Sequence, residues 1–295
     1  MNDKSSVFSW FVHGVMVVIV CACISPFLLL LISSFTDEQY IVQHGYSFFP
    51  QKLSLSAYEY LWTNAENIFR AYGVTIVVTV VGTVGSLVLT SLLAYPLSRR
   101  ELPWRVGLTF IVFFTLLFSG GLVPTYLVYT QLIDLKNNIL SLIVPALLMN
   151  GFYVMLMRTF FSMTIPPALI ESSQMDGAGE WRTFYQIVLP LSQPVLATVG
   201  LFQTINYWND WFNGMIFLTD TRLFSIQNLL NRILLDIQFL STTNLTSSQS
   251  DILARIPTET VRMALAVVGI VPIVVAYPFF QKYFVQGLTV GAVKG

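Results

Sequence analysis

The stretch Glu171–Pro194 reads ESSQMDGAGEWRTFYQIVLPLSQP and lies between two long hydrophobic blocks of the chain. A helix can begin just before it, at Pro166–Pro167, and residues 168–175 continue with good helix formers. Gly177 and Gly179 then end that helix, because glycine adopts the backbone conformations of a tight turn without strain. The first half of the stretch therefore predicts one short helix followed by a glycine turn.

The second half of the stretch predicts a short amphipathic helix over Glu180–Leu189. Its apolar and aromatic side chains share one face, at i, i+3, i+4 and i+7: Trp181, Phe184, Tyr185 and Val188. Pro190 and Pro194 end this helix and begin the next hydrophobic block. The insert is expected to be a helical pair held against one membrane surface. The same pattern also allows an interfacial helix that only lies on lipid.

The composition is that of an integral membrane protein. Of 295 residues, 55% are hydrophobic and 10% are charged, whereas an ordinary soluble domain has about 25% charged residues. The formal net charge is zero, so the chain has no basic surface for a nucleic-acid backbone, and nucleic acid is not an expected partner.

Six apolar segments have about the 20-residue length that a membrane-spanning helix needs. They are Phe11–Ile32, Tyr72–Leu97, Val106–Tyr129, Ile139–Phe161, Pro194–Leu218 and Met263–Phe284. The predicted fold class is therefore an all-α integral membrane protein with six transmembrane helices. We expect Ser119–Gly121 and Pro124 to interrupt the third helix. Gly82, Gly85 and Ser86 in the second are small enough for close helix packing.

The sidedness follows from the cations in the short loops. Lys and Arg divide almost evenly between the two sides, but the short loop Ser98–Arg105 contains Arg99, Arg100 and Arg105. This bias favours cytoplasmic termini. We therefore divide the chain into residues 1–70, a first transmembrane helix with an extracellular cap, and residues 71–295, a five-helix core that includes the cytoplasmic loop 162–193.

The chain has no sequence pattern typical of catalysis. It contains no GxxxxGK[ST] nucleotide-binding loop, so it is not expected to hydrolyse ATP by that route. His13 and His44 are isolated and lack the paired spacing of metal ligands. We expect neither an enzyme nor a metal protein, and any ATP-driven motor must be another polypeptide.

The stretch Glu171–Pro194 resembles the EAA loop of permeases from binding-protein-dependent ABC importers. That loop has an acidic residue, two small residues, Asp-Gly-Ala, and then Phe, Ile and Pro at fixed distances. The matching residues are Glu171, Ser172, Ser173, Asp176, Gly177, Ala178, Phe184, Ile187, Pro190 and Pro194. Both alanines of the loop's name are serine here, which keeps the small size that close approach requires.

The resemblance extends along the chain to the carbohydrate-uptake permeases, in the branch for complex poly- and oligosaccharides. Three further matches carry it: SGGLVPTY at Ser119–Tyr126, YWNDWFNG at Tyr207–Gly214 and GLTVGAVKG at Gly287–Gly295. The resemblance implies a type I ABC importer permease fold with a cytoplasmic coupling helix, in a bacterial cell membrane. It also implies ATPase coupling through Glu171, Ser172, Ser173, Asp176, Gly177, Ala178 and Phe184.

The resemblance implies several partners. They are a homologous second permease, two cytoplasmic ATPase subunits that bind ATP and Mg²⁺, and an extracellular solute-binding protein that delivers a carbohydrate. Heteromeric pairing is the family expectation, although the residues also allow a homodimer.

For a sugar pathway, the fifth span offers a polar and aromatic cluster: Gln203, Asn206, Tyr207, Trp208, Asn209, Asp210, Trp211 and Asn213. Amide and carboxylate groups bond sugar hydroxyls, and aromatic rings stack on sugar C–H faces; at membrane depth polar groups face a bundle interior or a wet cavity. The alternative is an interhelical hydrogen-bond network with an aromatic interface belt.

A self-contained secondary transporter is the rival function. Against it stand the lack of a detectable internal repeat, the lack of paired broken helices in corresponding halves, and the lack of an intramembrane acid–base chain around Asp210.

Overall fold

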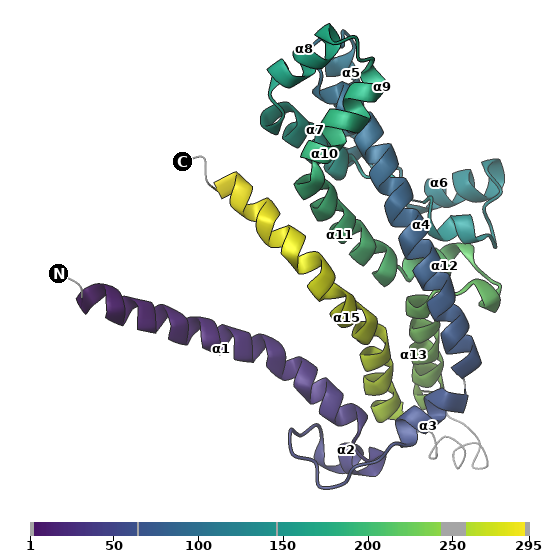
Figure 1. The fold of residues 1–295 in the computed structure, drawn as a ribbon. Helices are drawn as coiled ribbons and strands as arrows, with labels where there is room; N and C mark the ends of the chain where they lie inside the picture. The colour runs from purple at the N-terminus through teal and green to yellow at the C-terminus, as the bar shows by residue number, and fades with distance from the viewer. Residues whose placement is uncertain (1–2, 64, 146, 243–257, 293–295) are drawn as a thin grey trace. The chain divides into compact units, whose positions relative to one another are not determined.

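The structure is a computed structural model and describes residues 3–63, 65–145, 147–242 and 258–292. These residues are helical apart from their connections, and the extended pairing among them is one isolated bridge between Thr36 and Leu53. The chain forms two compact units, and Figure 1 traces their helices by residue number. Unit 1 comprises Met1–Glu66 and Leu230–Pro272, and unit 2 comprises Asn67–Leu229 and Ile273–Gly295.

Unit 1 begins with the long helix α1, Asp3–Ser34. Apolar side chains are exposed on every side of α1 from Phe8 onward, as expected for a helix surrounded by lipid. Two short helices follow, α2 (Glu38–His44) and α3 (Ser56–Thr63). The segment predicted to form an extracellular cap is therefore folded into helices.

Glu38 joins α2 to the start of α15, Thr258–Ala292. Its Oε1 accepts hydrogen bonds from the Glu259 N–H at 2.9 Å and the Thr258 hydroxyl at 3.2 Å. Its Oε2 accepts from the Thr260 N–H at 2.9 Å and the Thr260 hydroxyl at 2.8 Å. A carboxylate in this position satisfies N–H groups that a helix N-terminus otherwise leaves free and complements the helix dipole.

Replacement of Glu38 with alanine is expected to lower the stability of the chain by about 2 kcal/mol, because hydrogen bonds to a charged group contribute about 1.5–3 kcal/mol. Thermal denaturation of the purified protein in detergent measures the change. Glu59→Ala, which removes an exposed carboxylate from α3, is the matched control. Equal melting temperatures for the two variants would contradict the capping role.

Unit 2 is built on α4, Ala65–Ser98, which coincides with the second predicted span. The third span is interrupted as predicted, because α5 (Arg105–Leu117) and α6 (Leu122–Leu127) meet at Gly121, whose φ is +84°. A π-helical turn, η1, extends α6 over Val128–Leu132, and the axis bends by 115° at the break.

The predicted fourth and fifth spans are also shorter as helices than the apolar runs. Helix α7 begins only at Gly151, where the Asn150 side chain accepts a hydrogen bond from the Phe152 N–H at 2.8 Å. Helix α11 ends at Asn209, before the fifth predicted span does. The remaining bounds of this region are η2 Ile139–Leu142, α7 Gly151–Thr164, α11 Gln193–Asn209, α12 Phe212–Phe217, η4 Thr221–Leu223 and α13 Ile226–Thr242.

Three described helices are long and apolar enough to cross a membrane, and the number rises to six if each of three bent helix pairs is one span. The predicted six is therefore the upper value for the described residues. If the six spans are divided into two halves of three, the break in the third span and the break in the fifth span fall at different places in their halves.

Small residues of α4 allow α11 to pack closely against it, as expected. The Tyr207 ring lies where a side chain at residue 82 would project, and the Gln203 side-chain amide donates to the Ser86 hydroxyl. A second set of buried side chains, at the other end of α4, joins it to the loop 162–193: Ala94, Tyr95, Leu97, Met157, Phe161, Ile165, Ile170, Phe184 and Val188.

Candidate functional site

The first half of the loop 162–193 folds as the sequence predicts. Helix α8 is Pro167–Met175, with proline in its first turn, and the Ala178 N–H donates to the Ser173 carbonyl at 2.9 Å to close the turn. Gly177 has a φ of +76°, and no atom lies within 4 Å of a Cβ built on it. Glycine is therefore needed here for backbone conformation and not for space.

The second helix of the loop consists of three joined pieces. These are α9 (Glu180–Thr183), the π-helical turn η3 (Phe184–Val188) and α10 (Leu189–Leu191). The prediction that Pro190 ends this helix is wrong, because Pro190 lies in the first turn of α10, where proline is tolerated. Phe184 and Val188 are buried on one face, whereas Trp181 and Tyr185 are exposed. The predicted apolar face is thus divided between the core of unit 2 and the surface of the loop.

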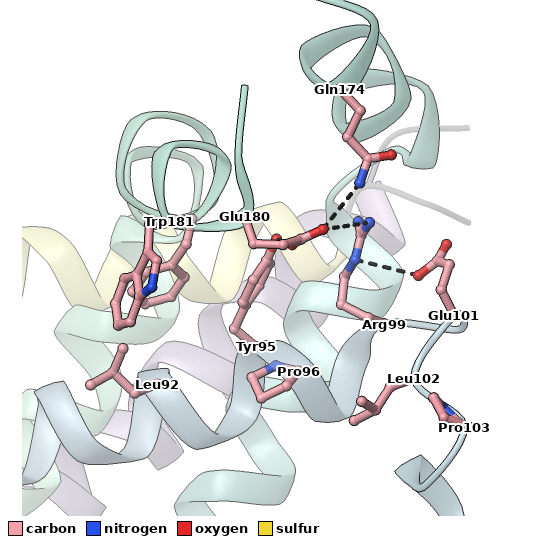
Figure 2. A pocket seen from close by; sticks show the side chains of 11 residues that line it. Leu92, Tyr95, Pro96, Arg99, Glu101, Leu102, Pro103, Gln174, Glu180 and Trp181 are labelled. Atoms are coloured by element: carbon pink, nitrogen blue, oxygen red, sulfur yellow. Dashed lines mark hydrogen bonds and ion pairs between the residues drawn. The ribbon is translucent and has the colours of Figure 1, made fainter. Parts of the chain in front are cut away.

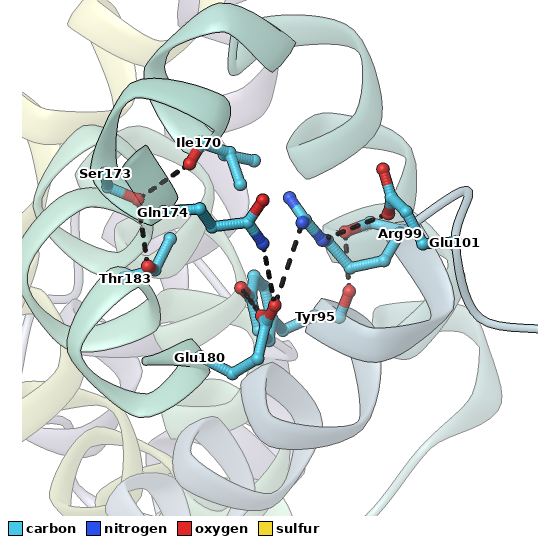
Figure 3. A network of polar contacts seen from close by, with 9 residues as sticks. Tyr95, Arg99, Glu101, Ile170, Ser173, Gln174, Glu180 and Thr183 are labelled. Carbon is cyan, nitrogen blue, oxygen red and sulfur yellow. Dashed lines mark hydrogen bonds and ion pairs between the residues drawn. The ribbon is translucent and has the colours of Figure 1, made fainter. Parts of the chain in front are cut away.

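Ser173 fixes α8 against α9. Its hydroxyl lies 2.8 Å from the Ile170 carbonyl and 3.0 Å from the Thr183 hydroxyl, and both Ser173 and Thr183 are buried (Figure 3). An alanine at residue 173 would leave the Thr183 hydroxyl without this partner. The serine that replaces alanine in the EAA pattern thus contributes a hydrogen bond within the loop.

Glu180 connects α9 to both α8 and α4. The Tyr95 hydroxyl donates to its Oε2 at 2.5 Å, the Gln174 amide donates to its Oε1 at 3.1 Å, and the Arg99 guanidinium lies 3.8 Å from Oε1 (Figure 3). Tyr95 lies in the last turn of α4 and Arg99 directly follows that helix, at the end of α4 that Figure 1 shows next to α9. One carboxylate therefore bonds three side chains from two other elements.

Arg99 has the least exposed charged side chain of this group. Its side chain is 13% exposed, against 59% for Glu180 and 72% for Glu101, which lies 3.4 Å from the Arg99 Nε. The guanidinium carbon also lies 5.9 Å from the centre of the Tyr95 ring. Because the guanidinium is shielded from water, its attraction to Glu180 is screened less than that of a surface pair.

A cavity of about 470 Å³ adjoins these residues (Figure 2). Trp181 and Leu92 lie on one side of it, while Arg99 and Glu101 lie toward the other side; Phe184 also lines the cavity. The cavity thus lies between the loop 162–193 and the end of α4, and Glu180 is part of its lining.

The residues predicted to contact an ATPase divide by exposure. Glu171, Ser172, Asp176 and Gly177 are exposed, and Ala178 is half-buried. Ser173 and Phe184 are buried, and the Phe184 ring packs on Tyr95 with centroids 5.1 Å apart.

Sequence reasoning missed Tyr95, Gln174 and Glu180 as functional residues, and it identified Arg99 only as a cation that sets sidedness. Tyr95 and Glu180 lie 85 residues apart, and no spacing pattern connects them.

Four residues of the predicted pathway cluster are buried within unit 2: Gln203, Tyr207, Trp208 and Asn213, the last of which is 7% exposed. Gln203 and Tyr207 are each 1% exposed and Trp208 is 8% exposed. The Gln203 amide also donates to the Leu147 carbonyl at 3.0 Å, and the Tyr207 hydroxyl donates to the Ile143 carbonyl at 2.9 Å. These contacts correspond to the interhelical network that the sequence left open as the alternative.

The other predicted pathway residues are more accessible. Asn206, Asn209 and Trp211 are exposed, and Asp210 is half-buried at the break between α11 and α12. Asp210 Oδ1 accepts the Asn213 N–H at 3.2 Å, whereas its buried Oδ2 has no hydrogen-bond partner in the described part of the chain.

The amino-acid sequence matches one family model over residues 4–290, that of the binding-protein-dependent transport system inner membrane component. The polygalacturonan/rhamnogalacturonan transport system permease protein YtcP of Bacillus subtilis (strain 168) is 36% identical over 294 residues, which cover 99% of this chain and 100% of that protein. The arabinooligosaccharides transport system permease protein AraQ of Halalkalibacterium halodurans is 28% identical over 300 residues, 100% of both chains.

A solved structure has the same fold. It is the crystal structure of a bacterial ABC transporter involved in the import of the acidic polysaccharide alginate, with a TM-score of 0.80 and 27% identity. The match covers 96% of this chain and 99% of that chain. The chain therefore belongs to the binding-protein-dependent transport system inner membrane component family and is a non-catalytic, multi-pass permease subunit of an ABC importer.

Proposed function

We propose that the importer carries oligosaccharides or fragments of polysaccharides. The similarity to permeases for polygalacturonan/rhamnogalacturonan and for arabinooligosaccharides, over nearly the whole of each chain, is the observation that carries this assignment. The fold shared with an alginate importer supports it.

In this proposal the protein lies in a bacterial cytoplasmic membrane with both termini in the cytoplasm. Two ATPase subunits, which bind ATP and Mg²⁺, contact the loop 162–193, and an extracellular binding protein delivers the sugar to this permease and a homologous partner. The cations Arg99, Arg100 and Arg105 lie in the short loop next to this region, which supports a cytoplasmic position.

The exposed part of the loop is the proposed ATPase contact. Glu171, Ser172, Asp176 and Gly177 present polar atoms and backbone, with Ala178 at the edge. Buried Ser173 and Phe184 hold the two helices together and against α4, so that movement of the ATPases is transmitted to the membrane helices as a rigid-body displacement.

The accessible side chains of the fifth span are the proposed sugar contacts: Asn206, Asn209, Asp210 and Trp211. Gln203, Tyr207 and Trp208 support that surface from behind, since their own polar groups or rings pack within unit 2. The exposed Trp211 ring suits stacking on a sugar, and the exposed Asn209 amide suits hydroxyl binding.

The proposal predicts ATP-dependent uptake by proteoliposomes that contain this chain and the subunits that co-purify with it. Glu171→Lys is expected to reduce recovery of the ATPase at least about tenfold, because it reverses a charge on the contact surface. Glu66→Lys, outside the loop, should leave recovery unchanged. Uptake driven by a proton or sodium gradient without any ATPase would instead identify a secondary transporter.

A further inference from the structure

A second cavity, of about 280 Å³, lies between α5 and α7 and has no role in the functions described above. Arg105, Val106, Thr109, Phe110 and Phe113 line it from α5. Met155 and Arg158, in the middle part of α7, contribute from the other helix. Both arginines are half-buried, so neither guanidinium is simply a solvated surface charge.

The cavity carries a local excess of positive charge. Its lining contains two guanidinium groups and no carboxylate. Arg158 donates through Nε to the Leu97 carbonyl at 3.1 Å, which fixes the guanidinium, and its terminal nitrogens make no hydrogen bond or ion pair with the described residues. Arg105 makes no ion pair among the described residues. The cavity beside Glu180 differs, because there Arg99 is balanced by Glu101 and Glu180.

The rest of the lining is suited to an acyl chain. Val106, Phe110 and Phe113 follow Arg105 along α5 at i, i+4 and i+7, so they share one face of the helix, and all three are exposed. The Thr109 hydroxyl on the same cavity is buried and has no hydrogen-bond partner in the described residues. A hydroxyl of this kind can donate to an ester or phosphate oxygen.

We propose that this cavity binds the headgroup of an anionic phospholipid, with the phosphate between Arg105 and Arg158 and an acyl chain along Val106, Phe110 and Phe113. Guanidinium groups bind phosphate through paired hydrogen bonds, and basic pockets between transmembrane helices are suited to anionic lipid headgroups. The apolar face favours a lipid over free phosphate, which has no apolar part. In the orientation proposed above this lipid lies in the cytoplasmic leaflet, and only that placement rests on the proposed function.

The position of the site gives the lipid a structural effect. Its phosphate would bridge α5 and α7, and α7 leads directly through Ile165 into α8 of the loop 162–193. A bound lipid would therefore restrain the membrane helix on which the loop is mounted.

The test is lipid binding to the full-length chain, purified in detergent with its co-purifying subunits and followed by native mass spectrometry. Dioleoylphosphatidylglycerol is expected to bind at least about fivefold more tightly than dioleoylphosphatidylcholine. Arg105→Gln should weaken the phosphatidylglycerol complex about fivefold, and Arg105→Gln with Arg158→Gln about twentyfold. Arg100→Gln, which removes an exposed cation from the adjacent loop, is the matched control.

Arg105→Lys keeps the charge and tests whether the loss in Arg105→Gln comes from misfolding, since it should recover most of the binding. Equal affinity for the two lipids, or equal losses in Arg100→Gln and Arg105→Gln, would overturn the proposal. Sodium phosphate that binds with the same dependence on Arg105 would show a site for soluble phosphate and would overturn it as well. This detergent assay does not depend on sugar transport or on sidedness, so its failure would leave the proposed function intact.

Discussion

Glu180→Ala is expected to reduce ATP-driven sugar uptake at least about tenfold while the ATPase subunits still co-purify. The substitution removes the acceptor for the Tyr95 hydroxyl and the Gln174 amide and the partner of Arg99. Loss of such charge-assisted bonds costs about 1–3 kcal/mol, and each 1.4 kcal/mol is about a factor of ten. The loop would keep its ATPase contact but lose its polar connection to α4. Uptake per ATP hydrolysed, measured in proteoliposomes, is the deciding quantity.

Glu101→Ala is the matched control for this prediction. Glu101 also pairs with Arg99, at 3.4 Å, but it lies in the short connection after α4. Among the described residues it makes no hydrogen bond or ion pair with the loop 162–193. Its loss should leave the ratio of uptake to hydrolysis near the wild-type value. Glu180→Gln retains an acceptor for Tyr95 and should fall between the two. Wild-type coupling in Glu180→Ala would show that the loop transmits force without this carboxylate.

Gly82→Ala is expected to destabilise the permease by about 1–3 kcal/mol, the usual cost of overpacking a core. A Cβ at residue 82 would lie 2.5–2.7 Å from three atoms of the Tyr207 ring. The ring cannot move away easily, because it is buried and its hydroxyl is bonded to the Ile143 carbonyl. Thermal unfolding in detergent should show a melting temperature lowered by several degrees.

The chain offers both a control and a compensating change for Gly82→Ala. Gly85→Ala places its Cβ 3.3 Å from one terminal atom of the flexible Leu148 side chain, so it should cost much less. Combining Gly82→Ala with Tyr207→Leu removes the ring that clashes and should recover part of the loss. If Gly82→Ala melts at the same temperature as Gly85→Ala, the close approach of α4 and α11 is not as described.

The sequence was sufficient to predict the class of protein and the outline of the loop 162–193. Hydropathy and length gave the membrane assignment, because lipid demands long apolar runs. Pro167 and Gly177 marked the start and end of α8, since each residue has a local backbone preference that needs no tertiary context. For the same reason Gly121 correctly marked the break between α5 and α6.

Other features depended on contacts that no local pattern contains. The apolar run 139–161 predicted one continuous helix, yet α7 starts only after Asn150, whose side chain caps it. Hydropathy measures whether a segment suits lipid and does not report where its helix begins. The polarity of Gln203 likewise indicated a membrane-depth hydrogen bond without identifying Ser86 and Leu147 as its partners. Glu180 became significant only when α4 and α9 were seen together.

The chain turns two nearly square corners around the loop 162–193, 77° between α7 and α8 and 78° between Glu180–Leu191 and α11. A thrust on the loop therefore reaches two membrane helices at once, as a torque on each. The Asn206 amide of α11 donates to the Tyr153 hydroxyl of α7 at 3.0 Å, which joins these two helices at their ends away from the loop. Rotation of α7 or α11 would therefore move the other helix as well. A small displacement of the loop 162–193 at the membrane surface would then rotate both helices deeper in the bilayer.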